Sequence, residues 1–100
     1  MEIFNSPIEF EWDSHNIEHL RKHKVESGEC EQVFFNIPLV KQDIDHSHVE
    51  ERYFALGKTN MDRVLVVIFT VRKAKIRVIT ARDANKKERI RYETQENSPI

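Results

Sequence analysis

Basic side chains crowd one stretch of this 100-residue chain and suggest what it binds. Nine lysines and arginines fall between positions 72 and 91, and no glycine-rich phosphate loop accompanies them. Because guanidinium and ammonium groups bind phosphate oxygens, the cluster favours an anionic ligand, whereas the missing loop excludes an obvious nucleoside triphosphate site. The alternative is a basic face that is only solvated. The nine residues are Arg72, Lys73, Lys75, Arg77, Arg82, Lys86, Lys87, Arg89 and Arg91.

Arg77 stands out in this cluster because it interrupts an apolar stretch, residues 76–81. A guanidinium beside apolar groups on a sheet face needs a partner, since an unpaired buried charge is costly. The partner could be a phosphate, which arginine meets with a fork of donors. It could equally be a carboxylate of the protein itself, and Glu51, Asp83 and Glu88 are the candidates.

Three histidines, His15, His19 and His23, recur every four residues and could form a stripe along one helix. Zinc needs convergent ligands, and three side chains on one straight helix diverge, so a site would need a further ligand from His46 or His48. No HExxH or CxxC pattern is present. We therefore expect neither a metal site nor a cofactor.

Proton transfer is the other chemistry that these residue types support, because histidine titrates near neutral pH. His23, beside Lys22 at the end of the expected helix, is one candidate. Glu51 is another, since it follows the loop that holds His46 and His48. The alternative for this acidic stretch, residues 50–51, is a structural salt bridge to Arg72 or Arg77 on a neighbouring strand.

The hydrophobic pattern predicts the order β-α-α-β-β-β-β-α for the elements that position these residues. The expected strands are 8–12, 39–44, 51–58, 63–71 and 76–81, and the expected helices are 14–24, 27–35 and 83–92. Asp13 or Ser14, Ser27 and Asp83 are the expected N-caps, since short polar side chains accept hydrogen bonds from the first turn.

An α+β fold follows from this order. The four later strands have short links, so they should form an antiparallel meander, with the N-terminal strand and two helices packed on it and a C-terminal helix. In the strand 51–58, alternation places Phe54 and Leu56 on the face opposite Tyr53 and Ala55. Residues 1–100 are expected to form one domain, with 94–100 as a frayed tail.

The net charge of -1 conceals a strong asymmetry. Residues 1–62 carry 6 basic and 13 acidic side chains, whereas residues 63–92 carry 10 basic and 2 acidic ones. Such a division indicates a polyanion site or a partner of matching polarity, unless the two segments neutralise each other across one surface. A single cysteine, no signal peptide and no apolar run longer than 64–69 predict a cytoplasmic protein without a membrane partner.

Several stretches, taken together, resemble the BrnT family, the toxins of type II toxin–antitoxin modules. The match extends over about residues 8–93 in one consistent order. The residues that carry it are Phe10-Glu11-Trp12-Asp13, His19 to Val25, Val33-Phe34, Asp45 with Glu50 to Tyr53, Leu56-Gly57, Arg63 to Val67, Thr70 to Arg72, Ile76 to Arg82, Ala84, Glu88-Arg89 and Tyr92.

The resemblance implies a fold like that of the RelE ribonucleases and RNA cleavage that blocks translation. It also implies a cognate antitoxin of the BrnA type that neutralises the toxin in a hetero-oligomer. Operator DNA would be bound only through the antitoxin complex. RNA carries its own nucleophile, the 2′-hydroxyl, so such an enzyme needs no metal, serine or cysteine.

On this hypothesis the chain must bind the phosphate, move protons and hold the RNA backbone. Arg72, Arg77 and Arg82 would bind the phosphate and stabilise its charge. Lys22 and His23 would transfer protons, Glu51 would be an alternative base, and Tyr92 would support a base or the leaving group. The remaining RNA contacts are expected from Lys73, Lys75, Lys86 and Arg89.

One residue departs from the family pattern. Members usually have glycine after the Lys-His pair, where this chain has Lys24. Since glycine readily takes the left-handed conformation at a helix end, Lys24 predicts a different exit from the first helix. Two other functions stay open: a nucleic-acid-binding or antitoxin-docking module without catalysis, and an interaction domain whose acidic first half docks a basic partner.

Overall fold

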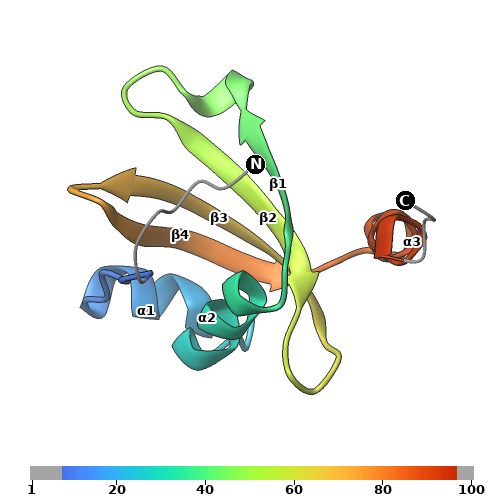
Figure 1. Ribbon diagram of the computed structural model, residues 1–100. Helices are drawn as coiled ribbons and strands as arrows, with labels where there is room; N and C mark the ends of the chain where they lie inside the picture. The colour runs from blue at the N-terminus through green and yellow to red at the C-terminus, as the bar shows by residue number, and fades with distance from the viewer. Residues whose placement is uncertain (1–7, 97–100) are drawn as a thin grey trace.

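A four-stranded antiparallel sheet carries the helices of this protein (Figure 1). The computed structural model describes residues 8–96. The strands, in the spatial order β1-β2-β3-β4, are β1 (Leu39–Asp43), β2 (Arg52–Lys58), β3 (Val64–Arg72) and β4 (Lys75–Asp83). The helices are α1 (Ser14–Arg21), α2 (Ser27–Phe35), the short 3-10 helix η1 (Ile44–His46) and α3 (Lys86–Glu96). The predicted meander and α+β class are confirmed.

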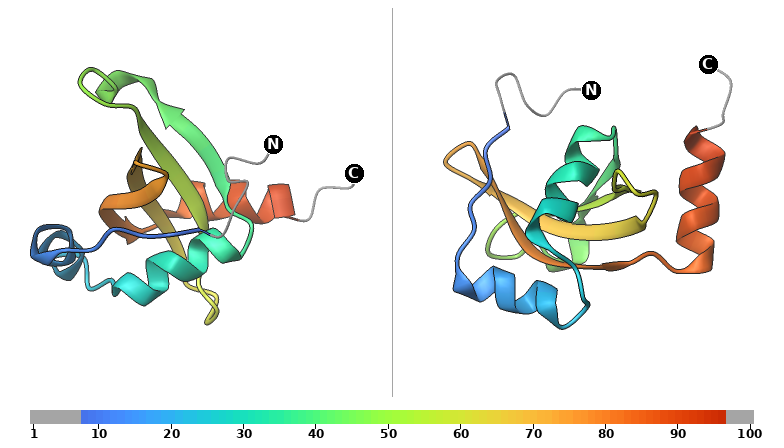
Figure 2. Two further views of the ribbon diagram at one scale, coloured as in Figure 1. Left: turned by 60° about the vertical axis from the view of Figure 1, so that its left-hand side comes forward. Right: turned by 90° about the horizontal axis from the view of Figure 1, so that it is seen from below.

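The helices cover the two faces of the sheet unequally (Figure 2). α1 packs mainly on β4 and α2 on β2, over a core that includes Leu65, Val67 and Phe69. We call this side the helical face. The opposite side, the open face, carries a smaller cluster, in which Tyr92 of α3 packs with Val66. No helix within residues 8–96 is long and apolar enough to cross a membrane.

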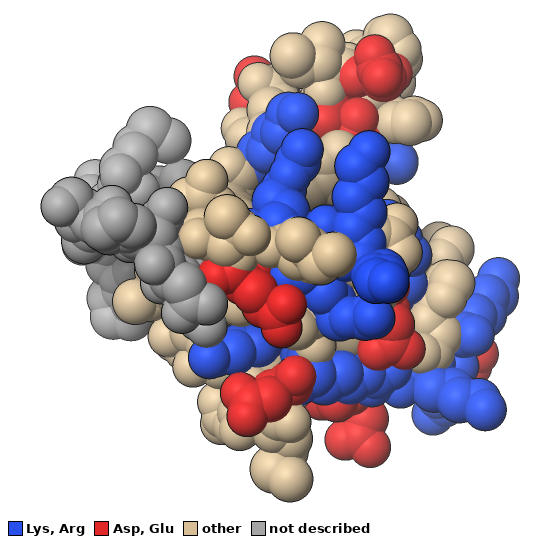
Figure 3. Space-filling view, turned by 90° about the vertical axis from the view of Figure 1, so that its right-hand side faces the viewer, with Lys and Arg blue, Asp and Glu red and all other residues tan. Residues whose placement is uncertain are grey.

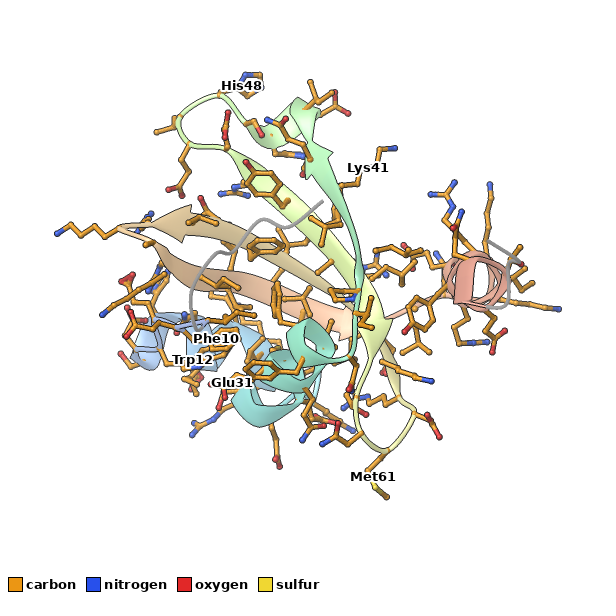
Figure 4. The ribbon with its side chains drawn as sticks, viewed as in Figure 1. Phe10, Trp12, Glu31, Lys41, His48 and Met61 are labelled. Carbon is orange, nitrogen blue, oxygen red and sulfur yellow. The ribbon has the colours of Figure 1, made fainter. Side chains whose placement is uncertain are left out.

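The N-terminal strand predicted at 8–12 is wrong as a full strand. Only Phe10 forms a bridge, parallel to Ile76 of β4, before Asp13 starts the first helix. Phe10 and Trp12 nevertheless point into the helical core, and the Trp12 indole Nε1 donates to Glu31 Oε2 of α2 at 2.8 Å (Figure 4). Two backbone hydrogen bonds with Ile76, each 2.8 Å, and these aromatic side chains together hold the segment against β4 and the helical core.

The N-caps of α1 and α2 are Asp13 and Glu26, one as predicted and one different from the prediction. Asp13 caps α1 as predicted, and its carboxylate accepts from the backbone N–H of Asn16 at 3.1 Å. The prediction that Ser27 caps α2 is wrong: Ser27 is already helical, and Glu26 is the N-cap, with its backbone N–H donating to Glu29. The longer glutamate pair forms the reciprocal capping box that the serine does not.

The cap of α3 is also different from the prediction. Asp83 is the last residue of β4, and its carboxylate accepts two hydrogen bonds from Arg63, at 2.7 and 3.1 Å. Asn85 caps the helix instead: its side chain accepts from the N–H of Glu88 at 2.8 Å, and the carboxylate of Glu88 accepts from the N–H of Asn85 at 2.8 Å. The strand therefore runs two residues further than the expected end at residue 81.

A β-bulge changes the phase of β4. The register between β3 and β4 shifts at Ile68 and Phe69, and Ile79 is left out of it. Arg77 on one side of the bulge and Arg82 on the other both point to the open face, paired with residues of β3 that share that face. In an unbroken strand two residues five apart would point to opposite faces.

The exit of α1 is the one that glycine would give. Lys24 has a φ of 55°, in the left-handed region, and the N–H of Val25 donates to the carbonyl of Leu20 at 3.1 Å. The expectation that Lys24 forces a different exit is therefore wrong. A lysine tolerates this conformation at a cost, which the surrounding contacts offset.

Arg63 supplies the main contacts at this exit. Its guanidinium donates to the carbonyl of Lys24 at 3.0 Å and to the carboxylates of Glu29 and Asp83 at 3.0 and 2.7 Å. These bonds raise the pKa of Arg63 and lower that of Asp83. One side chain thus joins the exit of α1, the start of α2 and the end of β4.

Candidate functional site

The eleven residues predicted from the sequence to act on RNA fall into three separate places. The first pair, Lys22 and His23, follows α1 near the end of β4. A second group surrounds the β3–β4 turn and the start of β2, and a third lies at α3. The second group is Glu51, Arg72, Lys73, Lys75 and Arg77, and the third is Arg82, Lys86, Arg89 and Tyr92.

The first two groups lie at opposite ends of the β3–β4 hairpin. His23 lies close enough to Asp83, the last residue of β4, to help lower the pKa of its carboxyl group. Arg72 is the last residue of β3, beside the turn. At roughly 3.3 Å per residue the two ends of this hairpin are about 26 Å apart. The folded chain therefore does not bring His23 and Arg72 to one phosphate.

Arg77 has found carboxylate partners, but different ones from those expected. Its side chain is only 13% exposed, and Nη1 donates to Asp13 Oδ2 at 2.9 Å and to Glu11 Oε2 at 3.5 Å. This hydrogen bond from Arg77 lowers the pKa of Asp13. The candidates predicted from the sequence, Glu51, Asp83 and Glu88, were wrong. The N-terminal segment runs beside β4 and places the carboxylates of Glu11 and Asp13 next to Arg77.

The other two predicted phosphate ligands are also paired. Arg72 donates twice to Glu50, both at 3.0 Å, so of the alternatives for residues 50–51 Glu50 takes the salt bridge to Arg72. Arg82 donates to the two carboxylate oxygens of Glu88 at 2.8 and 3.0 Å. Each arginine lowers the pKa of its partner's carboxyl group through these hydrogen bonds. A phosphate must therefore replace or join a carboxylate to reach either guanidinium.

Glu51 and Tyr92 occupy contrasting environments. Glu51 is exposed, and its carboxylate accepts the hydroxyl of Tyr53 at 2.8 Å, which raises the pKa of that tyrosine. Tyr92 is 4% exposed and packs beneath α3 against Leu56 and Val66. Its position is that of a core side chain that holds α3 on the sheet.

A groove runs between α3 and the open face, with a volume of about 750 Å³. Its floor is apolar and comes from the sheet, whereas basic side chains from β1, β4 and α3 stand along it. Figure 3 looks onto the side that carries α3 and shows Lys and Arg gathered across its centre. The floor is Leu39, Phe54, Leu56 and Val66, and the basic residues are Lys41, Arg82, Lys87 and Arg91.

Lys41 and Phe54 were not among the predicted site residues. They are cross-strand partners on the open face, and Lys41 extends toward the side on which α3 lies (Figure 4). Both lie at least eighteen positions before the basic cluster, so only the sheet register brings them to it. Alternation along β2 had placed Phe54 on the correct face, which was the one available signal.

The arrangement suits a single nucleic-acid strand. Lysine and arginine along the walls can neutralise successive phosphates, while a half-buried aromatic ring on the floor offers a face on which a base can stack. Lys41, Lys87 and Arg91 have no ion-pair partner among the residues that the structure describes. These three cations are therefore available to a ligand without breaking a salt bridge.

Beyond the groove the open face becomes polar. Asp43 pairs with Arg52 across β1 and β2, and Thr70 pairs with Arg77 across β3 and β4. The buried Thr70 hydroxyl donates to the carbonyl of Glu51 at 2.7 Å. Polar and charged side chains therefore occupy the end of the open face away from α3.

The expected histidine stripe is incomplete. His15 and His19 have ring centroids 5.2 Å apart, but α1 ends at Arg21, so His23 lies outside the helix. Across residues 8–96, no three His, Cys, Asp or Glu side chains gather closely enough to hold a metal ion.

Comparison with known proteins adds a family assignment to this geometry. A family model described as the ribonuclease toxin BrnT of type II toxin–antitoxin systems matches residues 12–88, which include α1, α2, the whole sheet and the start of α3. Among curated proteins, none matches the chain significantly.

Proposed function

Since the chain belongs to the BrnT family of ribonuclease toxins of type II toxin–antitoxin systems, we propose that it cleaves RNA without a metal ion and binds that RNA in the groove between α3 and the open face. The observation that carries this proposal is the groove itself, where the cations of Lys41, Lys87 and Arg91 flank an apolar floor that includes the ring of Phe54. We also propose that the fold is of the RelE type, on the strength of two helices over one face of a small antiparallel sheet.

The groove favours single-stranded RNA over a duplex. Its apolar floor includes Phe54, and a base can stack there only if it is not already stacked and paired within a helix. Lys41, Lys87 and Arg91 would bind the phosphates on either side of that base. Arg82 would join them by exchanging its carboxylate partner Glu88 for a phosphate.

Chemistry is proposed at the polar end of the open face. The 2′-hydroxyl of RNA attacks the adjacent phosphorus, so the protein must hold the phosphate, take up the 2′ proton and stabilise the charge that develops. Arg72 and Arg77, with Glu51 beside them, stand at this end. Lys22 and His23 are too far from Arg72 and Arg77 to serve the same phosphate, so we propose that they contact another part of the RNA.

A cognate antitoxin, of the BrnA type, would neutralise the toxin. We propose that it presents acidic side chains to the groove, because a basic surface that attracts RNA attracts a carboxylate-rich segment by the same charges. The complex would be a hetero-oligomer and would bind operator DNA through the antitoxin. We place the activity in the cytoplasm, where it would block translation.

The direct test is cleavage of a labelled single-stranded RNA by the purified protein, with and without EDTA, resolved on a gel. We expect cleavage in both lanes. Cleavage that EDTA abolishes would refute the metal-independent mechanism. RNA that stays intact but is bound with a steep salt dependence would show instead a binding module without catalysis.

A further inference from the structure

A histidine–carboxylate pair lies at the polar end of the open face, at the junction of β1 and η1. The Nδ1 atom of His46 is 2.9 Å from Oδ2 of Asp43. Asp43 is buried, with 9% of its side chain exposed, whereas 68% of the His46 side chain is exposed. The carboxylate is therefore fixed by the fold, and the imidazole is held at one edge while its other edge faces solvent.

The loop around the pair is ordered by a second set of hydrogen bonds. The Ser47 hydroxyl donates to the backbone carbonyl of Asp43 at 2.6 Å, and it accepts from the backbone N–H of Arg52 at 3.0 Å. Asp43 and Arg52 are also cross-strand partners. These contacts tie the start of β2 to η1, so the position of His46 follows from the sheet.

The geometry fixes which ring nitrogen can accept a proton. A carboxylate only accepts hydrogen bonds, so Nδ1 must carry the hydrogen that it donates to Asp43. The lone pair is then on Nε2, at the exposed edge of the ring. This is the arrangement in which a carboxylate orients a histidine to act as a general base.

The pair is also close to the groove and to the arginines. Asp43 lies two residues along β1 from Lys41, a spacing of about 7 Å on the same face of the sheet. Its cross-strand partner Arg52 contributes, with Arg72, to the positive charge that lowers the pKa of Glu50. An RNA strand that follows the groove past Lys41 therefore reaches a phosphate-binding charge and an oriented imidazole together.

We infer that His46 is the proton acceptor for RNA cleavage and that Asp43 is its positioning residue; this inference rests on the proposed ribonuclease function. The Nε2 lone pair takes the proton of the 2′-hydroxyl, and the 2′ oxygen forms a bond to phosphorus. The bond between phosphorus and the 5′ oxygen breaks, its electron pair stays on that oxygen, and a proton from water joins it. The products are a 2′,3′-cyclic phosphate and a 5′-hydroxyl, and His46 returns its proton to solvent.

The competing explanation is that His46 only satisfies the buried carboxylate of Asp43. The variant His46→Asn separates the two, because an asparagine amide can still donate to Asp43 but cannot take up a proton. We expect it to melt at the temperature of the wild type and to cleave RNA at least about 100-fold more slowly. The matched control is His48→Asn, two residues further along the same exposed loop, with cleavage within about twofold of the wild type.

Two further measurements test the roles of the residues. Imidazole added to a His46→Ala variant should restore part of the cleavage, which a purely structural loss would not allow. Asp43→Asn introduced into the wild type should slow RNA cleavage. Introduced into the His46→Asn variant, it should slow cleavage little further, because a positioning residue acts only through the group that it positions.

Cleavage by the wild type tests the proposed ribonuclease function, and cleavage by the His46→Asn variant tests the role of His46. If the wild type leaves RNA intact, the ribonuclease proposal itself is overturned. If the wild type cleaves and His46→Asn cleaves as fast, or if His23→Asn rather than His46→Asn abolishes cleavage, the inference about His46 is overturned and the ribonuclease proposal stands.

Discussion

Arg77 and Arg82 point to the same face of the sheet although they are five positions apart on one strand. The bulge at Ile79 makes this possible, since an unbroken strand would send them to opposite faces. Arg82 then lines the groove, and Arg77 lies on the polar part of the same face. A single residue left out of the register thus places both arginines on one surface, one in the groove and one at its polar end.

The groove predicts how RNA affinity depends on salt. Replacing Lys87 and Arg91 together by glutamine should weaken binding and make the slope of log affinity against log salt shallower by about 0.7 for each lost phosphate contact on a single strand. Fluorescence anisotropy at several salt concentrations measures both quantities. Arg21→Gln is the control, because Arg21 is an exposed residue of α1 paired with Glu18. Equal weakening by this control would contradict a role for the groove.

The left-handed conformation of Lys24 predicts that a glycine at this position stabilises the folded protein. Replacing it by glycine removes the penalty of a left-handed side-chain-bearing residue, so the free energy of unfolding should rise by about 1 kcal/mol. Urea denaturation followed by circular dichroism measures the change. Lys24→Ala keeps the β-carbon and the penalty, and it should leave stability close to that of the wild type. A glycine variant no more stable than the alanine variant would show that the conformation is not strained.

Asp83 predicts a loss of stability in acid. Arg63 holds the pKa of its carboxyl group below the ordinary value of 3.8, so the ionised form favours the folded state above that pH. This contribution is fully present at neutral pH and is lost as the pH falls through 3.8 toward the lower folded-state pKa. Asp83→Asn should be less stable than the wild type at pH 7, by about 1 kcal/mol or less for so exposed a pair. The gap should close between about pH 5 and pH 2, as thermal melts at each pH would measure. A constant gap would contradict the charge argument.

Cys30 predicts a thiol that reacts only when the protein opens. The side chain is fully buried, and burial, with the nearby charges of Glu29 and Glu31, raises its pKa to about 12. Because the thiolate is the nucleophile, we expect the folded protein to react with an aromatic disulfide reagent at least about 100-fold more slowly than the protein in urea. The absorbance of the released thiolate follows the reaction. Rapid labelling of the folded protein would show that α2 detaches readily from the sheet.

The sequence predicts the elements well because their patterns are local. The hydrophobic pattern defined the three long strands to within two residues at each end, and Asp13, one of the two expected N-caps, starts α1. The bulge could not be predicted, since it arises from the register between β3 and β4 rather than from either strand alone. The partner of Arg77 was missed for a related reason: Asp13 is sixty-four positions away and meets it only across the edge of the sheet.

The candidate site was predicted less well than the fold. Arg82, which the basic cluster predicts as a phosphate ligand, lines the groove, whereas Lys41 and Phe54 reach the groove only through strand pairing. The hydrogen bond between Asp43 and His46 depends on the turn of η1, which polar spacing alone does not specify. Lys22 and His23 were grouped with Arg72 and Arg77 by residue type, whereas the length of the β3–β4 hairpin separates the two pairs.

Arg63 also has a consequence for how the chain folds as it is made. Its hydrogen bonds reach 39 residues back to Lys24, 34 residues back to Glu29 and 20 residues forward to Asp83. The exit of the first helix is therefore held by Arg63 only after 39 further residues have been made. Long-range contacts of this kind form late, since loop closure must precede them. Helix α1 would then gain its fixed exit only when β3, which begins one residue after Arg63, starts to form.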